Sequence, residues 1–134
     1  MAATFMNAEL DPSLAAIVNA LTGSGINMHL YSNNHIPTPA DTLANYTEAN
    51  YSTYAAVNTG LWSAASGGST GVSQSGGGGC LFSPGVLGTP QDCYGWYLTD
   101  VAGNLLGADV FTPGPLNLGG TTPAVLITPF LSLS

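Results

Sequence analysis

The spacing of apolar residues divides the chain into one amphipathic helix and a series of short strands. The helix is predicted over residues 11–25, where apolar side chains recur at positions i, i+3, i+4 and i+7. Asp11 can cap this helix, Pro12 suits its first turn, and Gly23 and Gly25 supply its end. The apolar stripe consists of Leu14, Ile17, Val18 and Leu21. We expect this stripe to be buried against another surface, either the domain's own sheet or a neighbouring subunit.

Alternation with a period of two residues predicts strands in much of the remaining chain. In residues 26–31, Ile26, Met28 and Leu30 alternate with polar neighbours, which is typical of a half-buried strand. Pro129 cannot donate a hydrogen bond to a neighbouring strand, so the last strand is predicted to be an edge strand or to be bulged there. The further predicted strands are 49–57, 61–65, 80–83, 93–99, 104–111 and 124–134.

Glycine, proline and short polar residues mark the connections between these strands. Residues 38–45 are predicted to form a short helix, because a proline follows a threonine that can cap it. The glycine-rich tract 66–79 is interpreted as a mobile loop or a distorted hairpin. Residues 100–103 have the composition of a hairpin turn, and residues 112–120 are interpreted as a loop.

About seven short strands separated by turns favour a sandwich or jelly roll over an α/β fold. The predicted fold class is therefore all-β, a single-domain antiparallel sandwich or jelly roll with an N-terminal helix. Residues 1–25 are expected to form a helical arm, and residues 26–134 the β-sandwich domain.

The charge of the chain excludes several classes of partner. Its 134 residues include no lysine or arginine, and the formal net charge is -7. Nucleic-acid binding draws most of its affinity from Lys and Arg, so a nucleic-acid partner is not expected. Anionic membranes and phosphorylated substrates are disfavoured for the same reason. An important ion pair with another molecule must therefore use cations that the partner supplies.

Cysteine content and hydropathy limit the chain further. Cys80 and Cys93 leave two alternatives, one disulfide bridge between adjacent strands or two buried thiols. Two cysteines are too few for a structural zinc site. We expect no secretory signal, because no basic segment precedes an apolar run, and no membrane span, because no apolar stretch approaches ~18 residues.

No motif for catalysis or metal binding stands out. Two carboxylates could converge in space as glycosidases require, but Asp11 and Asp41 are explained as helix caps and Asp100 as a turn residue. His29 and His35 would need a third metal ligand that the sequence does not nominate, and His29 is expected to be exposed. We therefore predict no enzymatic activity, no cofactor and no metal. The seven carboxylates are Glu9, Asp11, Asp41, Glu48, Asp92, Asp100 and Asp109.

Aromatic residues are candidates for a binding surface or for the core. Aromatic side chains with a polar tip are enriched at interfaces and can stack on sugar rings. The alternative is that they surround a small β core, which we favour for Trp96 and at least one tyrosine. Tyr31 and Tyr54 are kept as candidate interface residues, together with the apolar stripe. The aromatic residues considered are Tyr46, Tyr51, Tyr54, Trp62, Trp96 and Tyr97.

Residues 30–55, "LYSNNHIPTPADTLANYTEANYSTYA", resemble a segment of small proteins encoded among the structural genes of tailed phages. The similar features are an apolar strand, Asn-Asn, a Pro-Thr-Pro turn, a short helix with leucine, and an aromatic strand. Residues 94–111 and the closing "LITPFLSLS" extend the resemblance. The matching positions in the first segment are Leu30, Asn33, Asn34, Pro37, Thr38, Pro39, Leu43, Tyr46, Thr47, Glu48, Ala49, Tyr51 and Tyr54.

The resemblance implies a virion component, most simply a capsid decoration (cement) protein that stabilises the shell. The expected partners are the major capsid protein, which would supply Lys and Arg, and other copies of this chain on the capsid surface. The alternative is a tail or receptor-binding component that contacts host surface glycans. In a decoration protein the 30–55 segment would serve as a rigid corner of the structure.

Overall fold

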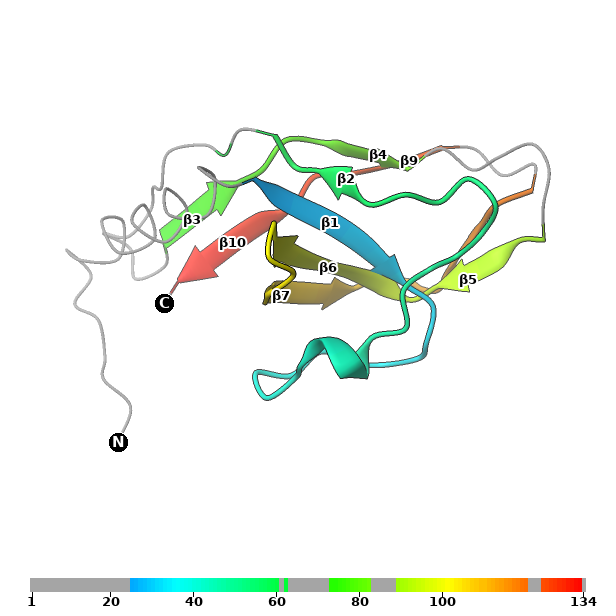
Figure 1. Ribbon diagram of the computed structural model, residues 1–134, viewed down its shortest axis with the longest axis horizontal. Helices are drawn as coiled ribbons and strands as arrows, with labels where there is room; N and C mark the ends of the chain where they lie inside the picture. The colour runs from blue at the N-terminus through cyan, green and yellow to red at the C-terminus, as the bar shows by residue number, and fades with distance from the viewer. Residues whose placement is uncertain (1–24, 61, 63–72, 83–88, 121–123, 134) are drawn as a thin grey trace.

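The computed structural model describes residues 25–60, 62, 73–82, 89–120 and 124–133 (Figure 1). All strand pairs in these residues are antiparallel, which confirms the predicted all-β antiparallel class. The predicted N-terminal helix and arm lie outside the described residues. Within those residues, no helix has the length and apolar character needed to cross a membrane. The elements are β1 (Ile26–Tyr31), the 3-10 helix η1 (Leu43–Asn45), β2 (Val57–Asn58), β3 (Ser73–Gly76), β4 (Cys80–Phe82), β5 (Gln91–Cys93), β6 (Gly95–Asp100), β7 (Leu105–Val110), β8 (Leu116–Leu118), β9 (Val125–Ile127) and β10 (Phe130–Leu133).

A four-stranded sheet in the order β2-β1-β6-β7 organises the fold. β1 and β6 pair along their whole length, from Ile26 opposite Asp100 to Tyr31 opposite Gly95. The predicted hairpin turn joins β6 to β7, and the Gly103 N–H donates to the Asp100 carbonyl at 3.1 Å. Gly103 has a φ of 87°, a conformation that glycine adopts without steric cost. The predictions of strands at 26–31, 93–99 and 104–111 are confirmed in their central parts.

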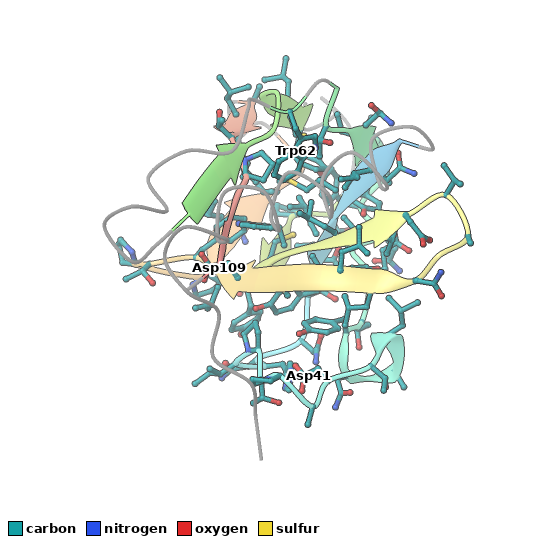
Figure 2. The ribbon with its side chains drawn as sticks, turned by 90° about the vertical axis from the view of Figure 1, so that its left-hand side faces the viewer. Asp41, Trp62 and Asp109 are labelled. Atoms are coloured by element: carbon teal, nitrogen blue, oxygen red, sulfur yellow. The ribbon has the colours of Figure 1, made fainter. Side chains whose placement is uncertain are left out.

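Two-stranded ribbons cover one face of this sheet (Figures 1 and 2). β3 pairs with β10 and β4 pairs with β9. Residues 73–82 therefore run antiparallel to residues 125–133, and their pairing is interrupted once. The interruption lies at Pro129, where the Gly77 N–H donates to the Pro129 carbonyl at 2.8 Å. The prediction of a break in the last strand at Pro129 is therefore confirmed, since a proline cannot donate to the ladder.

The main hydrophobic core lies between the sheet and the ribbons. The sheet contributes alternate residues of β1 and β6, and the ribbons contribute β4, β5 and β8. Both cysteines belong to this core. Burial of the apolar side chains from both sides stabilises the packing of the ribbons on the sheet. The buried members are Ile26, Met28, Leu30, Ala49, Tyr51, Cys80, Phe82, Cys93, Leu98 and Leu118.

The opposite face of the sheet is covered by the loop 32–50, which we call the corner. Tyr31 and Tyr97 of the sheet are buried beneath it and form a second cluster with Tyr46 of the corner. Figure 2 shows Asp41 of the corner and Trp62 on opposite sides of the sheet. Ser32 N–H donates to the Thr47 carbonyl at 2.8 Å, which closes the corner at its base. The sheet is thus buried on both faces.

Two predicted segments differ from the structure, and a third lies almost wholly outside the described residues. The strand predicted at 49–57 is reduced to β2 at its end, because Tyr51 and the half-buried Tyr54 both turn into the core, which a regular strand would not allow. For the strand predicted at 61–65, only Trp62 is described. The glycine-rich tract contains β3 over Ser73–Gly76, because pairing with β10 requires only backbone groups.

Two further predictions are corrected, the helix at 38–45 and the loop at 112–120. The helix predicted at 38–45 is a turn followed by η1, in which the Thr42 N–H donates to Asn45 Oδ1 at 2.8 Å. The predicted loop contains β8, which pairs with β5. Asn117 Nδ2 donates to Asp92 Oδ1 at 2.8 Å across this pair, and the leucines on either side turn inward.

Candidate interaction surfaces

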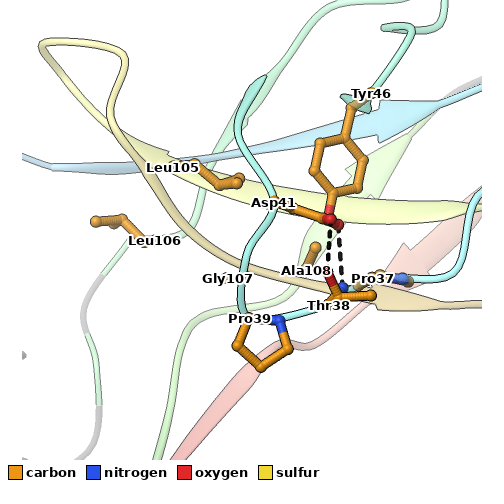
Figure 3. A pocket seen from close by; sticks show the side chains of 9 residues that line it. All are labelled: Pro37, Thr38, Pro39, Asp41, Tyr46, Leu105, Leu106, Gly107 and Ala108. Atoms are coloured by element: carbon orange, nitrogen blue, oxygen red, sulfur yellow. Dashed lines mark hydrogen bonds between the residues drawn. The ribbon is translucent and has the colours of Figure 1, made fainter. Parts of the chain in front are cut away.

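Asp41 is the centre of the corner. Its Oδ2 accepts hydrogen bonds from Tyr46 Oη at 2.7 Å and from the Thr38 N–H at 3.0 Å, and it lies 2.6 Å from His35 Nε2. Its Oδ1 accepts from Thr38 Oγ1 at 2.7 Å. Figure 3 shows how Asp41, Thr38 and Tyr46 converge. Because only 7% of the Asp41 side chain is exposed, these donors replace water around the carboxylate.

The hydrogen bonds to Asp41 favour its charged form. The Tyr46 hydroxyl, then His35, then Thr38 hold the pKa of the Asp41 carboxyl well below its usual range, against the opposing effect of burial. Burial, followed by the bond to Asp41, raises the pKa of Tyr46 above its usual value. Asp41 is therefore a structural anion that fixes the corner, beyond the capping role that the sequence predicted.

Tyr31 is part of the aromatic cluster under the corner and is fully buried. Its ring packs edge-on against Tyr46 at 5.1 Å, and its hydroxyl donates to the His35 carbonyl at 3.0 Å. Burial, with the nearby Asp109, raises its pKa to about 12. The interpretation of Tyr31 as a candidate interface residue is corrected, because the corner covers this face of the sheet and buries the side chain.

His29 is also less exposed than predicted, with 17% of its side chain accessible. Its ring stacks on Tyr97 at 4.8 Å, its Nδ1 lies 2.7 Å from Glu48 Oε1, and its Nε2 lies 2.9 Å from Thr99 Oγ1. Glu48 Oε1 also accepts from Tyr54 Oη at 2.9 Å. Tyr54 is half-buried, which leaves only part of its side chain for an interface.

The row Thr99–His29–Glu48 places a hydroxyl, an imidazole and a carboxylate in the order found in acyl-transfer triads. A nucleophile must be reachable by its substrate, and Thr99 is only 4% exposed. We interpret the row as a structural hydrogen-bond network that holds the corner on the sheet. Each histidine contacts a different carboxylate, and the described residues contain no group of three or more His, Cys, Asp or Glu that could hold a metal ion.

The two cysteines are free and buried, so the structure holds two thiols rather than a bridge. Burial raises the pKa of both, and burial together with Asp92 raises the pKa of Cys93 to about 11. A thiol needs a lowered pKa and exposure to act as a nucleophile, and neither cysteine has them.

The predicted interface residues of the N-terminal stripe lie outside the described residues and stay a prediction. They are Leu14, Ile17, Val18 and Leu21.

An exposed apolar pair on the ribbon was not predicted from the sequence. Leu81 of β4 and Leu126 of β9 are register partners, and they are 54% and 65% exposed. Cys80 and Phe82 on either side of Leu81 point into the core, so Leu81 must face outward. The sequence did contain a signal for this exposure. Cys80, Leu81 and Phe82 are three consecutive apolar residues, and in a strand at least one of them must lie on the outer face. Leu81 also lines a groove of about 170 Å³ that includes Tyr51.

A second surface is the groove between the corner and β7, with a volume of about 380 Å³. Figure 3 shows Pro39 on the corner side and Ala108 on the β7 side. Asp41 and Tyr46 also line it, so the hydrogen-bonded centre of the corner forms part of its wall. The complete lining is Pro37, Thr38, Pro39, Asp41, Tyr46, Leu105, Leu106, Gly107 and Ala108.

Comparison of the chain with protein-family models, with curated proteins and with solved structures found no match. The resemblance to phage virion proteins therefore stays a prediction from the sequence motifs.

Proposed function

We propose that this chain is a capsid decoration (cement) protein of a tailed phage, which binds the shell through protein–protein contacts. The exposed pair Leu81 and Leu126 is the observation that carries the proposal. Neighbouring apolar side chains on an outer surface favour contact with another protein, because burying each contributes roughly 1.5–3 kcal/mol. The motif resemblance implies that this other protein would be the major capsid protein.

The architecture supports an adhesive role. The four-stranded sheet and the ribbons pack against each other, and the corner covers the opposite face of the sheet. The N-terminal arm, residues 1–25, would place its apolar stripe at a boundary with a sister copy or with the shell, so that the protein acts as a homo-oligomer on the capsid surface. Since the chain has no Lys or Arg, ionic contacts would use cations of the capsid protein.

Aromatic burial favours the capsid over the alternative of a tail component that stacks on glycans. Stacking on a sugar requires an exposed ring, and the described tyrosines and tryptophans are buried or half-buried. The half-buried Tyr54 is oriented by two hydrogen bonds, from the Leu30 N–H and to Glu48.

Binding to isolated shells tests the proposal. Purified chain is mixed with shells of the phage that encodes it but lacking the chain, and bound protein is measured after sedimentation. The double variant Leu81→Ser with Leu126→Ser should lose most of the binding. Val101→Ser is the matched control, because Val101 is 64% exposed in the β6–β7 turn, away from the pair. Failure of the wild-type chain to bind shells would contradict the proposed function. Equal binding by the double variant would show that Leu81 and Leu126 do not contribute to shell binding.

A further inference from the structure

β7 is an edge strand with an open outer side in the described part of the chain. It is the last strand in the order β2-β1-β6-β7. Backbone groups in an antiparallel strand point alternately toward and away from the neighbour, and the Phe111 N–H donates to the Tyr94 carbonyl beside β6. Ala108 and Val110 therefore direct their backbone groups away from β6. In agreement, the Val110 N–H donates to Asp109 Oδ1 at 2.8 Å.

The groove lies beside this open edge. Four consecutive β7 residues, 105–108, form one wall, and the Pro37-Thr38-Pro39 turn forms the other. The prolines and the bonds from Thr38 to Asp41 fix the second wall, so little ordering is needed when a ligand enters. A strand added along β7 would place every second side chain in this groove, next to Ala108 and the Tyr46 ring.

The charges on this edge indicate the kind of strand that fits. Asp109 is exposed on β7, and no described residue bonds its second oxygen. Asp41 adds a negative charge in the groove wall. Another copy of this chain would bring no Lys or Arg to either carboxylate. Charge complementarity therefore favours a segment from a different, basic protein.

We propose that the β7 edge and the adjoining groove bind an extended segment of the partner protein by strand addition, with an apolar side chain in the groove and a Lys or Arg opposite Asp109. Backbone bonds along the strand would supply most of the affinity, and the alternating side chains the selectivity. The inference rests on the proposed function only for the source of the segment, which we take to be the capsid protein.

A synthetic peptide tests strand addition on the full chain. The probe is a ten-residue peptide in which lysine alternates with valine, titrated into the ¹⁵N-labelled chain and followed by NMR chemical shifts. We expect shifts confined to residues 105–110 and 37–41. A peptide of the same sequence with N-methyl groups at alternate residues cannot complete the ladder and should not bind. Shifts centred on Leu81 and Leu126, equal binding by the methylated peptide, or no shifts at millimolar peptide would each overturn the proposal.

The contribution of charge is tested separately. Asp109→Asn should weaken peptide binding by about threefold, since exposed ion pairs contribute little each. Replacing the lysines of the peptide by glutamate should abolish binding. The prediction of a basic partner is wrong if the Asp109→Asn variant binds the lysine peptide, and the wild-type chain binds the glutamate peptide, as tightly as the wild-type chain binds the lysine peptide.

The peptide and shell assays separate the two proposals. Shell binding without peptide binding at β7 would reject strand addition and leave the capsid function standing. Peptide binding at β7 without shell binding would reject the capsid protein as the partner and leave the strand-addition surface standing.

Discussion

The two faces of the four-stranded sheet are buried by different means. On the face toward the ribbons, Met28, Leu30 and Leu98 meet other apolar side chains. On the face under the corner, Tyr31 and Tyr97 meet aromatic rings and hydrogen-bonding partners. Apolar contacts are non-directional, whereas each buried hydroxyl must find a partner at a defined distance. The second face therefore fixes the corner's position more strictly than the first fixes the ribbons.

The described part of the chain meets this requirement fully. No buried side-chain nitrogen or oxygen there lacks a hydrogen-bond partner. Since no Lys or Arg is present, the corner is held by tyrosine, histidine, threonine and two carboxylates, Asp41 and Glu48. A chain without Lys or Arg can therefore still hold a loop in place by hydrogen bonds, but the position of that loop then depends on the protonation of a few groups.

The largest expected effect belongs to the apolar face. Leu98→Ala in the central strand β6 removes a side chain that is 0% exposed. We expect the free energy of unfolding to fall by about 2–5 kcal/mol, because a cavity adds to the lost burial. Urea denaturation measures the change, and Val101→Ala in the exposed turn should change it by less than about 0.5 kcal/mol. An equal, small effect of both variants would show that this face is not the main core.

Gly95→Ala tests how tightly the tyrosine face is packed. A Cβ at Gly95 would overlap the Asp109 carbonyl oxygen and lie 2.5 Å from Tyr31 Oη. Since these atoms must shift, we expect a loss of about 1–3 kcal/mol in the same urea experiment. Gly79→Ala is the matched control, because the atoms nearest to its Cβ belong to the exposed side chains of Leu126 and Thr128, which can move. A neutral Gly95→Ala variant would mean that the tyrosine face is loosely packed.

Alkaline pH should weaken the tyrosine face. Burial raises the pKa of Tyr31 and Tyr97 to about 12, with smaller contributions from nearby carboxylates, whereas unfolded tyrosines ionise near 10. Between these values the folded chain binds more protons than the unfolded chain, so stability is fully present below about pH 10 and declines as pH rises toward 12. Urea denaturation from pH 8 to 11 should show this decline, and Tyr97→Phe should reduce it. A flat profile in the wild type would contradict the burial of these hydroxyls.

Thiol labelling of the native chain should give the smallest signal of these experiments. It tests whether the cysteines of the apolar face are buried, without a substitution that alters the core. Cys80 and Cys93 are buried and their pKa values are raised, so a thiol reagent at pH 8 should react only slowly with the native chain. In denaturant, two thiols per chain should react rapidly. Fast labelling of the native chain would place a cysteine outside the core, and no labelling in denaturant would indicate a bridge.

The sequence predicted the four-stranded sheet better than the ribbons that cover one of its faces. β1, β6 and β7 and the turn at Gly103 follow from period-two alternation and turn composition, which are local signals. β8 and β3 were missed because they pair over only three or four residues, in segments rich in glycine and proline. Such ladders form through contacts with a distant segment, so local composition carries little information about them.

The site was predicted only in part for a similar reason. The spacing of Thr38 and Asp41 indicated a cap, and these residues do bond. The alternation in β1 could not distinguish a polar face open to water from one covered by a loop, so His29 was expected to be exposed and Tyr31 was kept as a candidate interface residue. Their burial depends on the path of the corner, which brings Glu48 back beside β1.

Amide hydrogen exchange in an Asp41→Ala variant tests most directly whether Asp41 holds the corner on the tyrosine face. The informative corner amides are those of Ser32 and Ala49, which donate to the Thr47 and Leu30 carbonyls. We predict faster exchange at these amides and unchanged protection at Leu98 in β6, because the corner would open locally while the apolar face stays closed. Unchanged exchange in the corner, or an equal increase at Leu98, would show that Asp41 does not hold the corner on the tyrosine face.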